Sequence, residues 1–543
     1  MAKTTLKTTC VVIGGGATGI GTLRDLSMRN IHAILVEQGT LANGTSARFH
    51  GLLHSGGRYA VNDTASAREC IIENKIVRHI APQAVEETEG FFVLLKADDP
   101  NFVEPWLKGC AEAGIETSEV DPKKATLLEP ELTPDLVKAF TVPDSCVDGF
   151  RLILHNQMSA ERYGGKILLH KKVTNILSNN GRIQAVELVD RKSGEQSIIE
   201  CDCVVNAAGS WSGAIAKLAG LDLAISPDRG TLIVFNHRLS TRVINRLHKS
   251  SDGDIFVPHG SITILGTTSQ PTNDPGDTRP TRTEILQLLE LGTQLFPKLI
   301  NYRILRSFAG TRPLYTPSAA TGRNASRNFH IVDHKQDGLS GFFSVFGGKF
   351  TTYRLMAERV CDMVAEYLHV QTTCRTAEEP LLSQPDPKLL EQSKKYFPFP
   401  NIHLMANRVG DSLPQVIDVA KKHCDQFGHN PLICECEMVS LAEILTLAHN
   451  NPNCTLKDIR IHSRMGMGTC QGTFCTLRTL NALFELESVT MNDPLTEIQH
   501  FLQERWRGVR QTLFGVQAQE LELTRSIYAG VLNVNEADYA NLN

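Results

Sequence analysis

The sequence predicts an α/β protein built on a parallel sheet, with further units attached to it. A glycine-rich turn joins a short apolar segment to a helical pattern at residues 10–28. Glycine-punctuated strands and helices then alternate through residues 1–374. Hydrophobic residues make up 41% and charged residues 21% of the chain, which is the usual balance of a folded protein. At about 150 residues per domain, the 543 residues predict several compact units.

The charge balance and the apolar pattern exclude several classes of protein. The chain has 55 Lys and Arg residues and 59 Asp and Glu residues, so its net charge is −4. This charge gives no positive electrostatic potential that would attract nucleic acid. No apolar run approaches the roughly 18 to 20 residues of a spanning helix, so we expect membrane association to be peripheral or through another subunit. The 14 cysteines are too dilute for a disulfide scaffold.

The N-terminal glycines form a G-x-G-x-x-G turn between a strand at 10–13 and a helix at 20–28. Gly14 permits the tight turn, Gly16 lets the backbone approach a pyrophosphate, and Gly19 allows close packing of helix on strand. The helix N-terminus adds amide N–H groups and a positive dipole. The apolar segment is too short for a signal peptide, so we interpret the turn as a nucleotide-binding site.

A second strand at 33–36 completes a βαβ unit and ends in Glu37. A carboxylate at this point accepts hydrogen bonds from a ribose diol and repels a 2′-phosphate, which disfavours NADP. The ADP half is common to NAD and FAD, so this unit alone leaves both open.

Several later motifs decide between the two nucleotides, because together they resemble the FAD-dependent glycerol-3-phosphate dehydrogenase family. The resemblance implies an FAD-binding Rossmann-like fold of the D-amino-acid-oxidase/glutathione-reductase type, with an inserted β-rich substrate region. With its cysteine-bearing tail, nearly the whole chain is similar to the bacterial anaerobic branch of that family. The motifs are at residues 44–48, 50–59, 204–209, 310–314 and 347–354.

The resemblance also implies which residues contact FAD. The strand at 342–346 runs into Gly347-Gly348-Lys349 and a helix beginning near Thr351, whose N-terminus would face the flavin edge where negative charge grows on reduction. Val173 has two equally good interpretations: it contacts the adenine, or it is an ordinary valine of the core. The expected FAD contacts are Gly14, Gly16, Gly19, Glu37, Thr45, Ser46, Val173, Ala208, Gly209, Gly347, Gly348 and Thr351.

Four cations match positions that hold the substrate phosphate or line its pocket in this family: Arg58, Arg312, Arg327 and Lys349. The planar fork of arginine suits a phosphate dianion because it donates two parallel bonds. Taken singly, each cation would more often be a solvated surface charge. Their place in apolar, glycine-rich or strand-end segments favours the pocket.

His54 and Tyr59 are expected near the flavin, with His54 a candidate to accept the proton of the substrate hydroxyl. A structural histidine is an equally good interpretation. His50 and His54 are four residues apart, but no H-E-x-x-H motif is present and the neighbouring glycines disfavour a helix, so a metal site here is not expected.

The tail carries Cys434-x-Cys436 and, after 33 intervening residues, Cys470-x4-Cys475. Four thiolates can hold zinc or a [2Fe–2S] cluster, and ordinary buried cysteines are the third alternative. Zinc sites commonly carry C-x-x-C pairs, from which C-x-C departs. The spacing resembles the bacterioferritin-associated-ferredoxin-like [2Fe–2S] domain, which implies a cluster with zinc as the alternative.

The chain is expected to divide at its proline-rich connector. We predict an FAD-dependent oxidoreductase domain at 1–374, a linker at 375–428, the cysteine domain at 429–484 and a helical tail at 485–543. Within the first domain, the nucleotide part is expected at about 8–85, 150–215 and 325–372, and the substrate part at about 86–149 and 216–324.

The tail is predicted to form an amphipathic helix that starts at Asp493 and Pro494. Packing on its own chain is the default for such a helix. Docking on a partner subunit or on an anionic membrane surface is the alternative.

The function that the resemblance implies is oxidation of sn-glycerol 3-phosphate to dihydroxyacetone phosphate. It also implies companion catalytic and membrane-anchor subunits, electron transfer to quinone, FMN elsewhere in the complex, and a peripheral place on the cytoplasmic face of the bacterial inner membrane. Two alternatives stay open: an amine or hydroxy-acid dehydrogenase of the same flavin superfamily, and a flavin and iron–sulfur subunit that only carries electrons.

Overall fold

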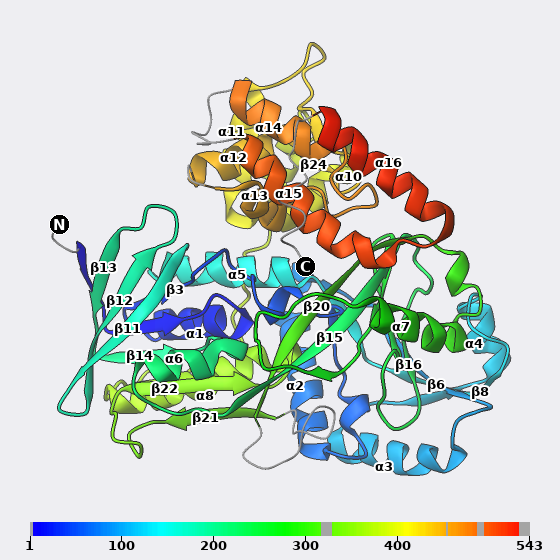
Figure 1. Ribbon diagram of the computed structural model, residues 1–543, viewed down its shortest axis with the longest axis horizontal. Helices are drawn as coiled ribbons and strands as arrows, with labels where there is room; N and C mark the ends of the chain where they lie inside the picture. Colours follow the sequence, from blue (N-terminus) through cyan, green and yellow to red (C-terminus); the bar gives the residue numbers. More distant parts are fainter. Residues whose placement is uncertain (1–3, 316–327, 452–453, 486–493, 532–543) are drawn as a thin grey trace.

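The structure, a computed structural model, describes residues 4–315, 328–451, 454–485 and 494–531. Two sheet-containing regions lie side by side, and the helices of the C-terminal third cover one edge of both (Figure 1). Among the described residues, no helix is both long enough and apolar enough to span a bilayer.

The first region is built on the sheet that the glycine motif predicts. The strands β2 and β3 and the helix α1 (Ala17–Met28) form the expected βαβ unit. All strands of this sheet run parallel except β21, which is antiparallel at the edge. Their order is β10 (Lys166–Leu168), β3 (Ala33–Val36), β2 (Cys10–Ile13), β14 (Cys203–Asn206), β22 (Phe342–Gly347) and β21 (Phe329–Asp333).

Alternate side chains of β2 enter two different cores, because successive residues of a strand point to opposite faces. Cys10 and Val12 pack against the helices α1, α5 (Gly149–Arg162) and α8 (Tyr353–Tyr367). Val11 and Ile13 pack against a second, smaller sheet and α6 (Ser212–Leu218). That sheet has the order β1 (Thr4–Lys7), β13 (Gln196–Glu200), β12 (Arg182–Asp190) and β11 (Lys171–Asn179). Both faces of the parallel sheet are therefore covered, and ligands reach it at the strand ends.

The second region is a large mixed sheet formed by the inserted β-rich segments. Helix α7 (Arg282–Leu295) packs on it through Ile285, Leu288 and Leu295 and begins at a Thr281–Glu284 capping box. The order is β19 (Gln270–Pro271), β15 (Ile225–Phe235), β18 (Ile262–Gly266), β17 (Ile255–His259), β16 (Val243–Arg246), β6 (Gly90–Leu95), β8 (Leu136–Val142) and β7 (Ser118–Val120), with β20 (Ile304–Tyr315) on β15.

Short elements connect the two regions. The small sheet β4–β9–β5 comprises Leu52–Leu53, Ser145–Val147 and Val85–Glu86. Helices α2 (Thr64–Ile80) and α3 (Val103–Ala113) pack on each other, and α4 (Pro122–Leu128) packs on β8 of the mixed sheet. The segment between β3 and α2 therefore passes from the parallel sheet to the mixed sheet, and it carries both candidate histidines.

The segment 375–428 is not a linker over most of its length, so that prediction is wrong. It contains α9 (Pro387–Ser393), α10 (Phe399–Val409) and α11 (Leu413–Lys422), which share a buried core. The prolines of these helices stand in their first turns, where the missing N–H costs nothing, so they start helices and do not interrupt them.

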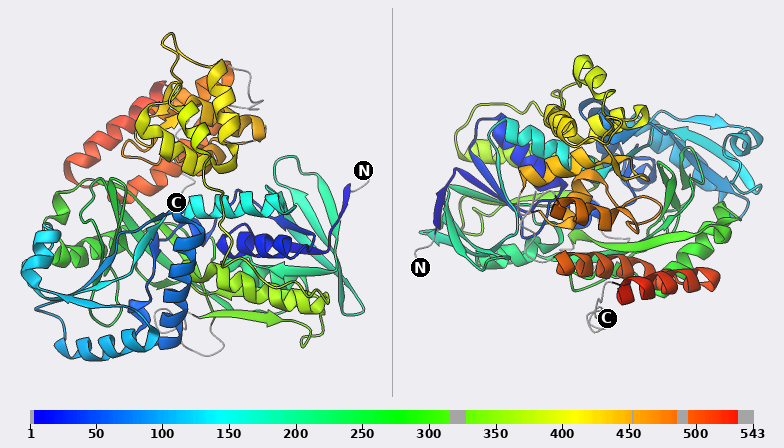
Figure 2. Two further views of the ribbon diagram at one scale, coloured as in Figure 1. Left: turned by 180° about the vertical axis from the view of Figure 1, so that it is seen from behind. Right: turned by 90° about the horizontal axis from the view of Figure 1, so that it is seen from above.

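The C-terminal part continues with helices around the cysteines. It comprises β23 (Leu432–Cys434), β24 (Val439–Ser440), α12 (Leu441–Asn450), α13 (Leu456–Ser463), α14 (Cys475–Glu485), α15 (Pro494–Val509) and α16 (Gly515–Val531). Helix α15 packs on its own chain: Ile498 and Leu502 enter the core around the cysteines, and the Ser307 hydroxyl of β20 donates to the carbonyl of Gly508 at 3.0 Å. Figure 2 shows α15 and α16 along the strands of the mixed sheet.

Candidate active site and cysteine cluster

A cavity of about 780 Å³ opens where the strands of the parallel sheet end. Its walls are formed by residues 13–18 after β2, 36–38 after β3, 171–174 of β11, 207–211 after β14 and 345–350 after β22. This is the crevice at the carboxyl ends of the strands in which doubly wound folds bind nucleotides.

The backbone passes so closely by Gly14 and Gly19 of the motif that neither position has room for a side chain. Gly14 has a φ of +113°, and a Cβ on it would lie 2.7 Å from the carbonyl oxygen of Ala207. A Cβ on Gly19 would lie 1.9 Å from the carbonyl oxygen of Gly14. Gly14 thus allows the C-terminal ends of β2 and β14 to lie side by side, and Gly19 allows α1 to pack against the turn.

Glu37 lines the cavity and is held by backbone amides. Its Oε2 accepts from the N–H of Gly15 and its Oε1 from the N–H of Gly39, both at 2.8 Å. Burial raises the pKa of the carboxyl, and these amides oppose the shift. The same carboxylate oxygens face the region where the motif places a ribose.

Most of the other expected nucleotide contacts lie in the same wall, whereas Gly19 and Thr351 do not line the cavity. Val173 is buried in the core between the two sheets and also lines the cavity, so both of its interpretations hold geometrically. The hydroxyl of Ser46 accepts from the N–H of Ala17 at the start of α1 (3.0 Å). The Thr45 hydroxyl donates to the carbonyl of Thr311 at 2.5 Å. Ala208, Gly209, Gly347 and Gly348 complete this part of the wall.

A second cavity, of about 670 Å³, adjoins the first and extends under the mixed sheet. Arg58 and Arg312 both line it. Its walls share His54, Tyr59 and Arg312 with the nucleotide cavity. The two arginines, which are 254 positions apart in the sequence, are therefore brought together beside the nucleotide crevice.

Each arginine is oriented by a buried carboxylate. Arg58 donates to Asp254 at 2.9 Å, and Arg312 donates to Asp228 at 2.6 Å and to the carbonyl of Thr268 at 3.0 Å. Burial alone would raise the pKa of Asp254, but the guanidinium of Arg58 holds it well below its usual value. The ion pairs fix the planes of both guanidinium groups at the cavity wall.

Lys349 lines the nucleotide cavity, and its ammonium group lies beside Tyr59, which lines both cavities. Its Nζ donates to the Ser66 hydroxyl at 3.0 Å and sits 4.6 Å from the centre of the Tyr59 ring. Arg327, the fourth predicted cation, lies outside the described residues.

His54 is half-buried beside these cations. Its backbone N–H donates to the hydroxyl of Thr351 at 3.0 Å, and its ring lies 5.9 Å from that of Tyr59. Burial lowers the pKa of His54 well below the usual 6.5, and the neighbours His50, Arg58 and Lys349 add to the shift. The imidazole is therefore neutral at pH 7 and able to accept a proton.

His50 lies next to His54 but is engaged differently. Its Nδ1 accepts from the N–H of Leu52 at 3.1 Å, and its carbonyl accepts from His259 at 3.0 Å. Burial, with Arg58 and Arg312, lowers its pKa to about 3. No hydrogen bond to the ring nitrogens of His54 is found in the described part of the chain, so of the two histidines His54 is better placed to bind a substrate hydroxyl.

The four predicted cysteines lie in one connected cluster in the C-terminal part. The thiol of Cys475 hydrogen-bonds with those of Cys434 and Cys470, and Cys470 contacts Cys436. The interaction with Cys475 lowers the pKa of Cys470 to about 5 and that of Cys434 to about 7, and the same interaction raises the pKa of Cys475 well above its usual value. Within the described residues, no three His, Cys, Asp or Glu side chains are gathered closely enough to hold a metal ion as they stand.

The surroundings of the cluster suit thiolate ligands. The amides of Gly466 and Glu437 lie close to the Cys434 sulfur, and those of Gly472 and Phe474 lie close to the Cys470 sulfur, and each lowers the pKa of its thiol. Amide N–H groups near sulfur stabilise its negative charge and tune iron–sulfur centres. A Cβ on Gly468 would lie 2.3 Å from the Cβ of Cys436, so the backbone passes closely around the cysteines.

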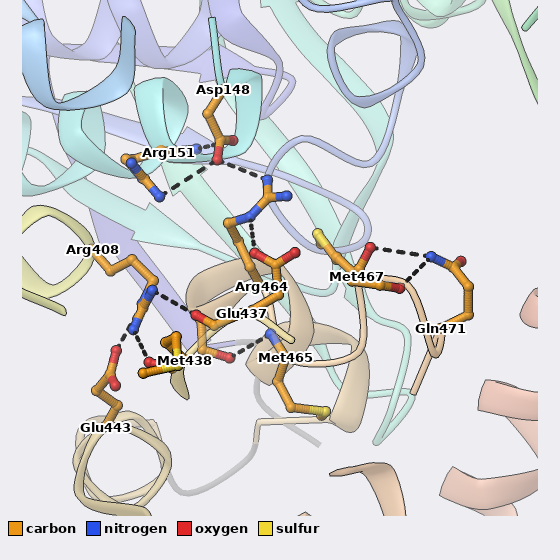
Figure 3. A network of polar contacts seen from close by, with 12 residues as sticks. Asp148, Arg151, Arg408, Glu437, Met438, Glu443, Arg464, Met465, Met467 and Gln471 are labelled. Atoms are coloured by element: carbon orange, nitrogen blue, oxygen red, sulfur yellow. Dashed lines mark hydrogen bonds and ion pairs between the residues drawn. The ribbon is translucent and has the colours of Figure 1, made fainter. Parts of the chain in front are cut away.

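Charged contacts fix the Cys-x-Cys loop to the first region (Figure 3). Arg464 donates to Glu437, the residue after Cys436, and to Asp148 at the start of α5, both at 2.8 Å. Arg408 donates to the carbonyls of Glu437 and Met438 at 3.1 and 2.8 Å and to the carboxylate of Glu443 at 2.8 Å. The loop that carries Cys434 and Cys436 is therefore bound on both sides.

Comparisons with known proteins agree with this architecture. Residues 9–363 match the family model described as FAD dependent oxidoreductase. An anaerobic glycerol-3-phosphate dehydrogenase subunit of Haemophilus influenzae is 38% identical over 537 residues, which are 98% of this chain and 94% of the relative. The corresponding subunit of Escherichia coli K12 is 39% identical over 531 residues, 97% of each chain.

The chain belongs to this family of anaerobic glycerol-3-phosphate dehydrogenase subunits. Because the relatives match over nearly their full length, the family includes the C-terminal cysteine region as well as the FAD-dependent oxidoreductase part.

A solved structure supports the fold class. The glycerol-3-phosphate dehydrogenase from Bacillus halodurans, complexed with FAD, superposes with a TM-score of 0.70 at 23% identity and covers 94% of this chain and 96% of that chain. The predicted FAD-binding α/β fold with an inserted β-rich region is confirmed.

The sequence analysis missed several residues that line or support the site. Asp254 and Asp228 orient the arginines, and Lys249 adds a cation to the second cavity. Aspartates at these positions carry no local signal, because each becomes significant only by pairing with an arginine far along the chain. His50 was considered only as a metal ligand, although the apolar residues around it gave a signal for burial.

Proposed function

We propose that this chain oxidises sn-glycerol 3-phosphate to dihydroxyacetone phosphate. The observation that carries the proposal is the shared wall of the two cavities, where His54, Tyr59 and Arg312 face both a nucleotide crevice and a cationic pocket. Bound FAD would supply the acceptor for the hydride from C2 of the substrate. The names of the relatives support the choice of substrate.

FAD would be held by the crevice at the ends of the parallel strands. The amides at the start of α1 would face the pyrophosphate, and Glu37 would accept from the ribose. Val173 would contact the adenine. The remaining proposed contacts are Gly14, Gly16, Gly19, Thr45, Ser46, Ala208, Gly209, Gly347, Gly348 and Thr351.

The phosphate of the substrate would be bound by Arg58, Arg312 and Lys349. The forks of both arginines are fixed by carboxylates, so little side-chain entropy is lost on binding. Arg327 stays a prediction for the same pocket. Binding of the phosphate orients C2 toward the wall that carries His54 and Tyr59, and such positioning supplies much of the rate in reactions of this kind.

The proton of the C2 hydroxyl would be accepted by a ring nitrogen of His54. The imidazole is neutral because burial and three neighbouring cations or imidazoles depress its pKa. The Thr351 hydroxyl, through the His54 backbone N–H, fixes the position of the residue. Tyr59, between His54 and Lys349, would limit access of water to this side of the pocket.

We further propose that Cys434, Cys436, Cys470 and Cys475 hold a [2Fe–2S] cluster, with zinc as the alternative. The amide donors around two of the sulfurs and the low pKa of Cys470 support thiolate ligation. A cluster would supply one-electron transfer. Companion subunits would then pass electrons to quinone, with this chain peripheral on the cytoplasmic face of the bacterial inner membrane. FMN elsewhere in such a complex stays a prediction.

Anaerobic absorption spectroscopy tests the proposal. Glycerol 3-phosphate is expected to bleach the flavin bands of the purified protein, while amino acids and 2-hydroxy acids leave them unchanged. Bleaching by the latter instead would indicate an amine or hydroxy-acid dehydrogenase. Elemental analysis of the same sample tests the cluster separately: zinc without iron would contradict it and leave the dehydrogenase proposal standing.

Substitution of Arg312 separates a dehydrogenase from an electron carrier. For Arg312→Ala we expect kcat/KM for glycerol 3-phosphate to fall by about 100-fold or more, because a charge-assisted bidentate contact is lost. Arg312→Lys, which keeps the charge without the fork, should retain part of the activity. Full activity of Arg312→Ala in the assembled complex would contradict the proposed substrate site.

A further inference from the structure

A third cavity, of about 220 Å³, lies between the first region and the C-terminal helices. One wall is formed by residues 42–49, the segment that also lines the nucleotide cavity. The opposite wall comes from α13, which contacts α5, and from α15, which lies over β20 (Figure 1). The cavity is therefore distinct from both pockets of the proposed reaction but shares a wall with the nucleotide site.

The charges in this cavity are strongly unbalanced. Arg48 reaches it from the segment after β3, Arg306 reaches it from β20 of the mixed sheet, and Lys457 and Arg460 reach it from α13. Arg464 and Asp148, which also line it, pair with each other. Among the described lining residues, these four cations are left to face one carboxylate, that of Glu504 on α15.

The pKa values reflect this imbalance. Burial alone would raise the pKa of Glu504, but Lys457, Arg460, Arg306 and Arg48 together lower it to about 2. Burial, reinforced by the charge of Arg460, lowers the pKa of Arg306 to about 10. With four cationic side chains against one carboxylate, the cavity carries a formal net charge of about +3.

Two donors in this cluster lack an acceptor. The Nε of Arg306 and the Nε of Arg460 are buried, and neither has a hydrogen-bond partner among the described residues. A buried donor without a partner costs about 1–3 kcal/mol, and more when the group is charged. Arg48 by contrast donates to the carbonyls of Asn43 and Gly44, and Lys457 donates to the side chain of Asn43 at 2.8 Å.

We propose that this cavity binds a small oxyanion of the phosphate type. A dianion would reduce the net charge from about +3 to about +1 and accept hydrogen bonds from the guanidinium groups of Arg306 and Arg460. The volume has room for a phosphate group with a few waters, each of which occupies about 30 Å³ in the liquid. Arginine forks favour the several acceptor oxygens of phosphate over a single carboxylate.

The bound anion would join the two parts of the molecule. It would contact Arg48 and Arg306 on one side and Lys457 and Arg460 on the other. A ligand that binds only the folded, docked arrangement raises its stability with concentration. Because Arg48 also holds the carbonyls of residues 43 and 44, the anion would brace the loop that carries Thr45 and Ser46.

Isothermal titration calorimetry with inorganic phosphate at low ionic strength tests the site. The titration uses FAD-loaded protein carrying Arg312→Ala, which weakens binding at the proposed substrate pocket. We expect one remaining phosphate per chain, with the affinity lowered at least about tenfold by a further Arg306→Gln or Arg460→Gln. Arg359→Gln, at an exposed position of α8, is the matched control and should change nothing. Absence of phosphate binding in the Arg312→Ala protein would overturn the proposal.

A gain of affinity gives a test that misfolding cannot imitate. Glu504→Gln removes the carboxylate from the cavity and is expected to tighten phosphate binding by about fivefold or more. Unchanged or weaker binding in this variant would contradict the site. Titrations with sulfate and with glycerol 3-phosphate separate the possible sources: equal affinities indicate a free inorganic anion, and preference for the ester indicates a phosphate monoester. Since calorimetry needs no turnover, the result is independent of the proposed oxidation.

Discussion

The nucleotide crevice and the cysteine cluster are built in different ways. In the crevice, short contiguous motifs set the backbone, and glycines allow strand ends and a helix to meet at distances that exclude a Cβ. The cluster is assembled from two distant loops, and arginines fix it to the rest of the molecule. The first site therefore depends on local backbone geometry, and the second on long-range charged contacts.

This difference predicts where each site is vulnerable. A single added carbon should damage the crevice, whereas the cluster should be most sensitive to loss of a buried charge at the interface. Two pairs of variants test this comparison.

The largest effect is expected at Arg464. Burial would lower the pKa of its guanidinium, but Asp148 and Glu437 raise it above its usual value, so the ion pairs are strongly favoured in the fold. Arg464→Met leaves both carboxylates partly buried without this partner, and we expect a loss of about 3 kcal/mol or more in unfolding free energy of the C-terminal part. Chemical denaturation or limited proteolysis of the purified protein measures it.

The control for this variant is Arg478→Met. Arg478 pairs with Glu435 beside the same cysteines, but both side chains are about half exposed, so the expected loss is below about 1 kcal/mol. Equal losses in the two variants would show that interface burial does not govern the stability of the cluster.

The next effect is expected at Gly19. In Gly19→Ala the new Cβ would lie 1.9 Å from the carbonyl oxygen of Gly14, so α1 must move away from the turn. We expect a loss of about 2–3 kcal/mol in stability together with loss of bound FAD, read from Tm and from the flavin absorbance per protein. Gly530→Ala, in the exposed helix α16 with open space around it, should be neutral or slightly stabilising. If Gly19→Ala retains FAD, the crevice does not depend on the close backbone approach at Gly19, and the proposed difference from the cysteine cluster is wrong.

The same difference explains which features the sequence predicts. The βαβ unit could be predicted with its strand limits because each element is local and the turn has no alternative to glycine at Gly14 and Gly19. The pairing of Arg58 with Asp254 spans 196 residues and that of Arg312 with Asp228 spans 84, so no local pattern contains either. The arginines were found through the family resemblance, and their carboxylates were not.

The failed linker prediction has a related cause. Prolines were interpreted as marks of an extended connector, but Asp386 caps α9 immediately before Pro387 and Pro400 stands in the first turn of α10. Proline restricts φ to values that the start of a helix also uses, so only the residues around it distinguish the two cases. The third cavity could not be predicted from the sequence either, because its cations come from segments separated by hundreds of residues.

The smallest expected effect is a pH dependence of stability caused by His50. Its pKa is about 3 in the folded chain, because of burial first and then Arg58 and Arg312, against about 6.5 when unfolded. Below pH 6.5 the His50 imidazole is protonated in the unfolded state but stays neutral in the folded state, so the free energy of unfolding decreases as the pH falls. At pH 5 the loss amounts to about 2 kcal/mol, since each pH unit below 6.5 contributes about 1.4 kcal/mol.

A variant of His50 isolates this contribution from other acid-sensitive groups. His50→Asn retains an acceptor for the Leu52 N–H but does not titrate, so its unfolding free energy should fall less between pH 7 and pH 5 than that of the unmodified chain. The exposed His32, substituted by Asn, serves as the control and should leave the pH dependence unchanged. If His50→Asn loses as much stability as the unmodified chain, the imidazole is not held neutral beside the arginines, and the argument for a neutral His54 loses its nearest parallel.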